Sequence, residues 1–209
     1  MARARYHHGD LRTALVVAAR ELIEREGAAG FSLREAARRV GVDPAACYRH
    51  FRNREEVLLA IAQEGFAALA ASFTEVRVKS RRADRPRELL VGLGRAYLAF
   101  AFARRAEFRI MFGESGTEAR DPRLRLPTVE RTAYEQLEDV VLAYLADVGM
   151  RRGDPARTAV QLWATVHGVT RLALDGAIPL DEPGARGVLD DAIAVALDGL
   201  ESRARKGRR

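Results

Sequence analysis

The sequence predicts an all-α fold of about nine helices, in which a small N-terminal bundle of short helices precedes a C-terminal bundle of longer ones. Three observations support this prediction. Apolar residues recur at the spacing of an amphipathic helix, and the alternation of a half-buried strand is almost absent. Helix-start signals recur, each a capping residue followed by proline or by a glutamate three residues later. A chain of 209 residues, 48% of them hydrophobic, is long enough for two such bundles.

Composition favours a soluble cytoplasmic protein. No apolar run approaches the ~18 residues that would predict a membrane span, and the opening MARARYHHGDLR lacks the apolar segment of a signal peptide. A single cysteine, Cys47, excludes an internal disulfide framework. The net charge of +6 is weak evidence for nucleic-acid binding, because five of the basic groups stand in the final segment SRARKGRR. We expect residues 203–209 to be a disordered basic tail.

The first two helices have clear signals. The first carries an apolar stripe that ends at Gly27 and consists of Leu11, Leu15, Ala18, Ala19, Leu22 and Ile23. Ser32, with Glu35 three residues later, forms a capping box that starts the second helix. Gly41 ends that helix after one short amphipathic stretch.

The third and fourth helices follow closely. Asp43 caps the third helix, and Pro44 occupies its first position, where a missing N–H costs nothing. Cys47 and Phe51 share one face of it and are expected to point inward. An asparagine cap at position 53 starts a fourth, longer helix.

The remainder of the chain also has helical spacing. Residues 77–86, RVKSRRADRP, are polar and basic and are expected to form a linker. The helices expected beyond it cover residues 86–104, 107–112, 126–147, 155–175 and 184–202. No internal repeat is present in the sequence.

A very short turn that begins with Gly41 joins the second and third helices. Two helices joined in this way cross at a large angle, so the second can project from the surface. An α-helix fits the major groove of DNA, where base edges are distinguishable, while the preceding helix positions it. The pattern is typical of a helix-turn-helix DNA-binding domain, although a plain three- or four-helix bundle would show the same spacing.

The residues after the third helix favour DNA binding. Tyr48, Arg49 and His50 are consecutive and polar-tipped, and they cannot all face a core. Tyrosine and arginine are frequent partners of DNA phosphates. Arg52 and Arg54 follow at once, so basic groups are concentrated at this point.

The segment FSLREAARRVGVDPAACYRHFRNREEVLLAI resembles the DNA-binding domain of the TetR/AcrR family of transcriptional regulators. The resemblance spans roughly residues 11–66. Its most specific part is Tyr48 and Phe51, three apart, followed by a basic residue and a glutamate-rich helix start. The chain departs from the family pattern at Asp43, Ala45 and Cys47, where the family usually has Ser or Thr, Gly or Pro, and Leu. The cysteine keeps a small apolar group inside.

This resemblance implies a set of DNA contacts. Phosphate contacts are implied for Ser32, Tyr48, His50 and Arg54. Contacts to a phosphate or to a base edge are implied for Arg34 and Arg49. The residues that would lie against the groove are Pro44, Ala45 and Ala46. A flexible arm in a minor groove is implied by Arg3 and Arg5. A solvated helix face is expected for Arg38, Arg39 and Arg52.

A second motif, WATVHG, lies in the C-terminal half. It places Trp163 and His167 four apart on one helix face, with Gly168 beside them. Glycine in a helix costs about 1 kcal/mol relative to alanine, which predicts that another helix packs close to Gly168. Together with YHHGDLR and FRIMFG, the motif resembles the C-terminal subclass of this family called the WHG domain.

Aromatic and methionine side chains cluster in the same half and could line an apolar cavity for a small-molecule effector. The candidate ligand-binding residues are Tyr97, Phe100, Phe108, Met111, Phe112, Tyr134, Trp163 and His167. Each could equally be a core residue, and His167 a hydrogen-bonded core or interface histidine. Four scattered histidines and one cysteine offer no metal-ligand spacing, so neither metal nor cofactor is expected.

The resemblance also implies a homodimer that binds double-stranded operator DNA. One short recognition helix covers few base pairs, and two-fold pairing doubles the site. The expected contact is made by the last two long helices. Its apolar surface would come from Val160, Val188, Ile193, Val195 and Leu197. Ligand binding would change the separation of the two DNA-binding heads if the ligand binds one spacing better than the other.

The predicted domains are a helix-turn-helix DNA-binding domain over residues 1–54 and a regulatory and dimerisation domain over residues 55–209, in which residues 55–80 form a connecting helix. The leading hypothesis is a ligand-responsive transcriptional regulator, a repressor, on a pseudo-palindromic operator. An enzyme is rejected, because Cys47, the best candidate nucleophile beside His50, faces inward with Phe51. A helical small-molecule or protein-binding module with a vestigial DNA head is the alternative.

Overall fold

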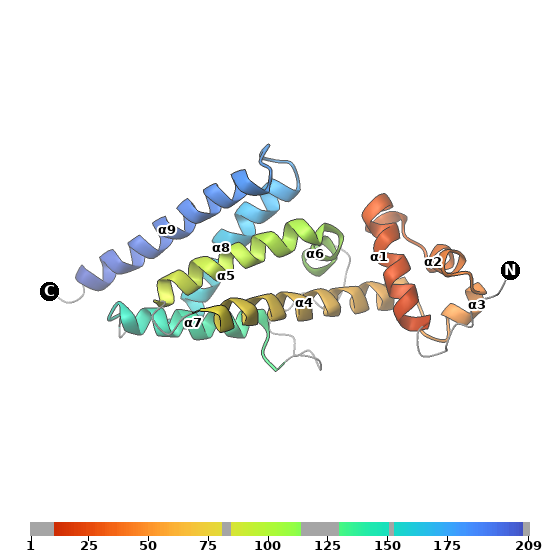
Figure 1. Cartoon of the computed structure of the whole chain (residues 1–209), viewed down its shortest axis with the longest axis horizontal. Helices are drawn as coiled ribbons and strands as arrows, with labels where there is room; N and C mark the ends of the chain where they lie inside the picture. The colour runs from red at the N-terminus through yellow and green to blue at the C-terminus, as the bar shows by residue number, and fades with distance from the viewer. Residues whose placement is uncertain (1–10, 81–84, 114–129, 151–152, 207–209) are drawn as a thin grey trace. The chain divides into compact units, whose positions relative to one another are not determined.

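Helices make up all of the regular secondary structure in the part of the chain that the structure describes. A computed structural model describes residues 11–80, 85–113, 130–150 and 153–206, and these ranges contain nine helices and no strand (Figure 1). The predicted all-α class is confirmed. Arg3 and Arg5, and the last three residues of the basic tail, lie outside the described ranges.

The first of two compact units consists of residues 1–65 and 105–121. Its described helices are α1 (Leu11–Gly30), α2 (Leu33–Val40), α3 (Pro44–Cys47), the first part of α4 (Arg54–Lys79) and α6 (Arg105–Phe112). Within this unit α1 packs against α2 and α6, and α2 packs against α3. Its core is built from large apolar side chains that include Leu15, Leu22, Phe51, Leu58 and Ile61.

The second unit consists of residues 66–104 and 122–209. It contains the rest of α4 together with α5 (Pro86–Ala103), α7 (Ala133–Asp147), α8 (Pro155–Leu174) and α9 (Glu182–Lys206). In this unit α5 packs against α7, α8 and α9, and α8 packs against α7 and α9. The predicted domain boundary after residue 54 falls at the start of α4, whereas the compact units divide within α4 and α6 belongs to the first unit.

Capping residues fix where these helices start. The Ser32 hydroxyl accepts the backbone N–H of Glu35 at 3.2 Å, as the capping-box sequence predicts. Thr132 and Glu135 form a full, reciprocal capping box before α7. This helix therefore begins at residue 133. The sequence predicted a start near residue 126, and that prediction is wrong at residues 130–132, because the structure shows them outside any helix. Gly27, with φ 78° and ψ 162°, interrupts α1 where its apolar stripe was expected to end.

An ion pair and a close approach join α5 to α9. Arg95 donates two hydrogen bonds to the carboxylate of Asp190, each at 2.8 Å. A Cβ added at Gly94 would lie 2.5 Å from Cδ1 of Ile193. Glycine at this position therefore lets the two helices pack closely.

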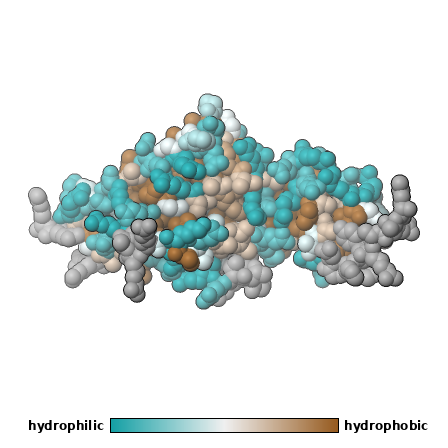
Figure 2. Space-filling view, in the orientation of Figure 1, coloured by the Kyte–Doolittle hydropathy of each residue, from teal (hydrophilic) through white to brown (hydrophobic). Residues whose placement is uncertain are grey.

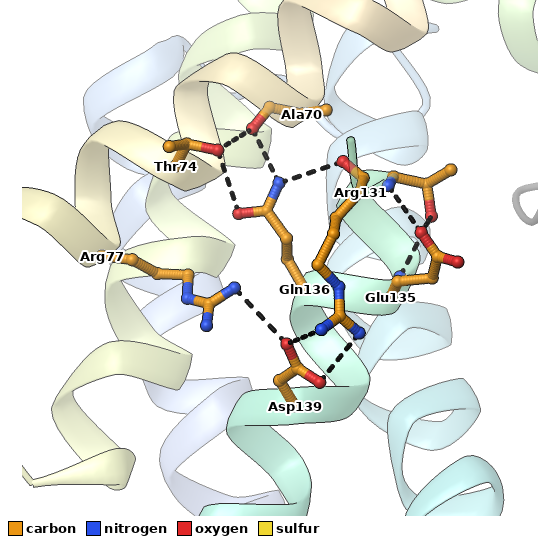
Figure 3. A network of polar contacts seen from close by, with 8 residues as sticks. Ala70, Thr74, Arg77, Arg131, Glu135, Gln136 and Asp139 are labelled. Carbon is orange, nitrogen blue, oxygen red and sulfur yellow. Dashed lines mark hydrogen bonds and ion pairs between the residues drawn. The ribbon is translucent and has the colours of Figure 1, made fainter. Parts of the chain in front are cut away.

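A buried amide joins α4 to α7 within the second unit (Figure 3). The Gln136 side chain donates through Nε2 to the Ala70 carbonyl at 2.9 Å and accepts the Thr74 hydroxyl through Oε1 at 3.2 Å. Nearby, the Asp139 carboxylate of α7 lies 3.5 Å from the guanidinium of Arg77 on α4. Because a buried amide needs its partners, Gln136 fixes the register of α4 against α7.

Two helices are longer than predicted. α4 continues through Lys79, into the segment that was expected to be a linker. α9 continues through Lys206, into the segment that was expected to be a disordered tail. Arg203, Arg205 and Lys206 therefore lie in the last turn of α9, where positive charge interacts favourably with the helix dipole.

By length and composition alone α4 could cross a membrane, but 50% of its most apolar window is buried inside the fold. A core helix of a soluble protein has the same composition. The buried half of that window therefore serves packing.

Hydrophilic side chains cover much of the face shown in Figure 2, with hydrophobic ones between them.

Candidate nucleic-acid interface

The turn between α2 and α3 is made by residues 41–43. Gly41 adopts the left-handed conformation (φ 79°, ψ 28°), which costs a glycine no steric strain, and its N–H donates to the Arg38 carbonyl at 3.1 Å. Asp43 then caps α3, because its carboxylate accepts the N–H of Ala45 at 2.7 Å. The predicted helix-turn-helix is therefore present in the first unit.

α3 is a single helical turn, and residues 48–50 continue it as hydrogen-bonded turns. The N–H groups of His50 and Phe51 both donate to the Cys47 carbonyl, at 2.9 and 3.0 Å. The side chains of Cys47 and Phe51 are buried, as their shared face predicted. They anchor the segment in the core, so the residues between them are held at the surface.

The residues predicted to contact DNA lie on α2 and its N-cap, on α3 and the turn after it, and at the start of α4. Those that are exposed are Ser32, Arg34, Ala45, Tyr48 and Arg49. Those that are half-buried are Pro44, Ala46, His50 and Arg54. The Ser32 hydroxyl accepts the cap hydrogen bond and still has its own proton to donate to a phosphate.

Ion pairs divide the arginines around this surface into two groups. The arginines expected on a solvated face each have a carboxylate partner: Glu35 for Arg38, Glu21 for Arg39 and Glu56 for Arg52. Arg34 and Arg49, which were expected to contact DNA, have no described carboxylate within 4.0 Å. A charge without an internal partner keeps its attraction for phosphate.

Arg54 has a structural role in addition to the predicted one. Its guanidinium donates to the carbonyl of Ala28, near the end of α1, and lies 3.7 Å from the carboxylate of Glu55. The side chain therefore joins the start of α4 to α1. A phosphate contact by Arg54 stays a prediction, and any variant of it will also loosen this junction.

The side chain of Cys47 is buried beneath this surface. Burial, and then the nearby Asp43 carboxylate, raise the pKa of the Cys47 thiol. Because the thiolate is the nucleophile, a buried thiol with a raised pKa is inert. Among the described residues, no group of three His, Cys, Asp or Glu side chains could hold a metal ion.

Sequence reasoning missed an ion-pair cluster that joins α1, α4 and α6. Nη2 of Arg20 lies 2.6 Å from Oε2 of Glu64, and its Nε lies 2.5 Å from Oε1 of Glu107, which is 3% exposed. The Nε contact is an ion pair without hydrogen-bond geometry. A Cβ added at Gly65 would lie 2.5 Å from Sδ of Met111, so α6 also packs closely on α4. The glutamate within the apolar run AEFRIMF was the available hint.

The candidate ligand-binding residues divide between the two units. In the first unit, α6 carries Phe108, Met111 and Phe112. In the second unit, α5, α7 and α8 carry Tyr97, Phe100, Tyr134, Trp163 and His167. Ring centroids in the second unit lie 6.1 Å apart for Tyr97 and His167, 5.8 Å for Trp163 and His167, and 6.2 Å for Tyr134 and Trp163. These four side chains form one contiguous aromatic group.

A hydrogen bond of 2.7 Å joins the Tyr97 hydroxyl to Nδ1 of His167. Burial raises the pKa of Tyr97 well above its ordinary value, so the hydroxyl keeps its proton. The tautomer of the His167 ring sets which of the two groups donates. Burial, and then the charge of Arg171, lower the pKa of His167, while Asp175 opposes them. His167 is therefore neutral and hydrogen-bonded, as the alternative interpretation expected.

The lowered pKa of His167 predicts a pH-dependent stability. In the unfolded chain His167 has the ordinary histidine pKa of about 6.5, so the unfolded chain takes up this proton at a higher pH than the folded chain does. The stability that neutral His167 contributes is therefore fully present above about pH 6.5 and is lost as the pH falls below it. A His167→Gln variant should therefore lose less stability between neutral and mildly acidic pH than the wild type. Urea unfolding at the two pH values measures the difference. Equal losses in both proteins would show that His167 is not held neutral by the fold.

Burial divides the residues expected at a dimer contact. Val160, Val188 and Val195 are exposed, whereas Ile193 and Leu197 are 2% and 0% exposed. The prediction is wrong for Ile193 and Leu197, because these two residues lie on the face of α9 that packs inside the chain's own core. The other three stay predictions.

Gly168 has open space beside it. A Cβ added at Gly168, or at Gly199 on α9, would meet no heavy atom within 4 Å among the described residues. No described helix of the same chain therefore packs close to Gly168, and the prediction that another helix does so stays open for a second copy of the chain. The side chains of Val160, Leu172, Val188 and Val195 are exposed on the same two helices. We call these residues, with Gly168 and Gly199, the α8–α9 face.

Comparison with known proteins covers both halves of the chain. Residues 15–61 match the family model of bacterial regulatory proteins, tetR family. Residues 90–196, about half of the chain, match a family model described as tetracyclin repressor-like, C-terminal domain. The narrower resemblance to the WHG subclass stays a prediction.

Similar proteins are found along nearly the full length. The tetracycline repressor protein class A from transposon 1721 of Escherichia coli is 26% identical over 215 residues, which cover 90% of this chain and 89% of that protein. A solved structure of a protein of unknown function from Rhodococcus sp. RHA1 has a TM-score of 0.71 and 27% identity, and covers 96% of this chain and 98% of its own. A TetR family transcriptional regulator from Thermus thermophilus has the same fold, with a TM-score of 0.65 at 20% identity over 88% and 97% of the two chains. With its helix-turn-helix and its C-terminal helical domain both matched, the chain belongs to the TetR family of bacterial regulatory proteins.

Proposed function

We propose that this protein is a ligand-responsive transcriptional repressor that binds a pseudo-palindromic operator as a homodimer in the cytoplasm. Family membership makes it a DNA-binding regulator. Repression, the effector, the operator and the mode of assembly are the proposal. The name of the E. coli relative, a tetracycline repressor, supports repression and a small-molecule effector.

The distribution of charge around the helix-turn-helix carries the proposal. Arg34 and Arg49 have no described carboxylate partner, while the arginines beside them are paired. Arginines that keep their full charge attract the phosphate backbone. A guanidinium can also bind the O6 and N7 atoms of guanine in the major groove, so either residue can contribute to sequence preference.

The small side chains of α3 suit a close approach to the groove. Ala45 is exposed and Ala46 is half-buried, and neither extends beyond a methyl group. A helix with such a surface lets its backbone approach the base edges, and an alanine can contact a thymine methyl. Hydrogen bonds would then come from Tyr48 and Arg49, immediately beyond.

The aromatic group of the second unit is the proposed effector site. Tyr97, Trp163 and His167 combine ring faces with polar tips, which is the usual composition of a small-molecule site. Gln136 ties α7 to α4, and α4 continues without a break into the first unit. An effector that binds one position of α7 better than another would therefore act on α4.

The α8–α9 face is the proposed contact between two copies. Exposed apolar residues on two neighbouring long helices mark an interaction surface. Gly168 and Gly199 leave room for side chains of another chain, since no described atom of their own chain fills the space. In a two-fold symmetric dimer that uses this face of both copies, α8 and α9 of one copy would pack against α8 and α9 of the other.

Alanine variants of Arg34 and Arg49 test the DNA-binding surface. Arg34→Ala and Arg49→Ala should each lower affinity for the protein's own upstream DNA by roughly 10- to 100-fold and change base preference, because a lost bidentate pair is worth about 1–3 kcal/mol. Tyr48→Phe removes only a hydroxyl and should weaken binding to all sequences alike. Gel shifts on that DNA and selection from a randomised pool measure both effects.

Arg38→Ala is the matched control, because Arg38 lies on the same helix as Arg34 and is also exposed, but is paired with Glu35. It should change affinity less than Arg34→Ala. Wild-type affinity in all the variants would show that DNA binds elsewhere. A wild-type protein whose binding to upstream DNA lacks a steep salt dependence would favour the helical binding module with a vestigial head.

A further inference from the structure

Arg12, in the first turn of α1, lies beside the DNA-facing segment. It is exposed, and its guanidinium carbon stands 4.8 Å from the centroid of the Phe51 ring. Phe51 is buried and follows His50 directly, with its N–H bonded to the Cys47 carbonyl. The start of α1 therefore places a positive group next to the turn that carries Tyr48, Arg49 and His50.

Among the described residues, none neutralises the charge of Arg12. No described carboxylate lies within 4.0 Å of the Arg12 guanidinium. Arg20, further along α1, differs because it pairs with two glutamates from other helices. The Phe51 ring attracts the guanidinium by a cation–π contact but carries no compensating charge. The donors of a guanidinium lie in its own plane, so a group stacked on a ring keeps N–H groups available at its edge.

We propose that Arg12 is a further phosphate contact of the DNA-binding surface, held in place by Phe51. The inference rests on the proposed operator binding and adds a residue of α1 to the residues of α2 and α3. Phe51 thereby has two roles, since its buried ring anchors the turn after α3 and positions a cation from α1. A phosphate contact fixes orientation and adds affinity without reading sequence. Arg12 should therefore act equally on every DNA sequence.

The salt dependence of binding separates this role from packing. Each phosphate neutralised by the protein contributes about −0.9 to the slope of log affinity against log salt. Arg12→Gln removes one contact per head, so a dimer should lose nearly 2 from the magnitude of that slope. Arg12→Lys keeps the charge and should keep the slope.

Arg25→Gln is the matched control, because Arg25 is also exposed on α1 and lies roughly 20 Å further along the helix axis. The measurement is fluorescence anisotropy of the full-length protein with a labelled random-sequence duplex, between about 50 and about 200 mM KCl. Melting temperatures of all the variants report whether each one folds. The expected result is a shallower slope for Arg12→Gln only.

Three results would overturn the inference. One is an unchanged slope for Arg12→Gln while Tyr48→Phe still weakens binding, which would leave the DNA-binding function standing. A second is an equal loss of slope in Arg25→Gln, which would indicate a general effect of net charge. The third is a wild-type protein without salt-dependent DNA binding, which would remove the proposed function together with this contact.

Discussion

Replacing Arg20 by methionine is expected to lower the free energy of unfolding of the first unit by about 3 kcal/mol. The change takes the Arg20 cation away from the buried carboxylate of Glu107, and removing one partner of a buried ion pair is strongly destabilising. We take the low end of the usual range, because the Arg20 side chain keeps 28% exposure. Helix α1 supports α2, so DNA binding should weaken as well.

Two spectroscopic probes distinguish unfolding of the first unit from unfolding of the second. The single tryptophan, Trp163, lies in the second unit and reports its unfolding by fluorescence. Helical circular dichroism reports both units. Arg20→Met should bring an earlier loss of circular dichroism in urea, while the midpoint of Trp163 fluorescence changes less.

A double variant checks the cause. Arg20→Met combined with Glu107→Met removes both charges and should recover most of the lost stability, because two apolar side chains replace a buried pair at little net cost. Arg25→Met is a control on the same helix, where the nearest carboxylate, that of Glu26, is 3.7 Å away and both side chains are exposed. Its effect should stay within about 0.5 kcal/mol. A double variant as unstable as Arg20→Met would rule out the broken Arg20–Glu107 pair as the cause.

Val195→Arg is expected to separate the proposed dimer into monomers. The Val195 side chain is 74% exposed in the single chain and stands on the α8–α9 face. A two-fold symmetric interface would contain the substitution in both copies, and each new guanidinium would lose its hydration without gaining a carboxylate partner. The dimer dissociation constant should rise by at least about 100-fold, with a corresponding loss of operator affinity.

Val78→Arg is the matched control, because this valine of α4 is 77% exposed and lies outside the α8–α9 face. Sedimentation of both variants over a range of concentrations measures the association. Gly168→Leu should act in the same direction as Val195→Arg without lowering the melting temperature of the monomer, since no described atom of the same chain fills the space beside Gly168. A dimeric Val195→Arg protein, or a monomeric Val78→Arg protein, would place the contact on another face.

Features with a local signal were predictable from the sequence. Ser32 and Asp43 cap the helices they were expected to cap, and Gly41 makes the left-handed turn between them. Such positions depend on residues within one turn of each other. The family was also predictable from local motifs, and the matched model is that of bacterial regulatory proteins.

Features that depend on distant residues could not be predicted in the same way. The pairing of Arg20 with Glu107 joins two helices that are far apart in the sequence, so no spacing indicates it. On α9, valine and isoleucine occupy both faces, and only the packing shows that Ile193 turns inward while Val195 turns outward. The hydrogen bond from Arg54 to the Ala28 carbonyl could not be predicted either, because it depends on where the end of α1 lies relative to the start of α4.

A footprint on the upstream DNA tests the central claim most directly. Wild-type protein should protect two half-sites related by two-fold symmetry and separated by one helical turn of DNA or a multiple of it. The Arg34→Ala/Arg49→Ala double variant should lose this protection at the same protein concentration, while Arg38→Ala should keep it. A symmetric footprint that survives in the double variant, or the absence of any footprint with the wild type, would contradict DNA recognition by α2, α3 and the turn that follows them.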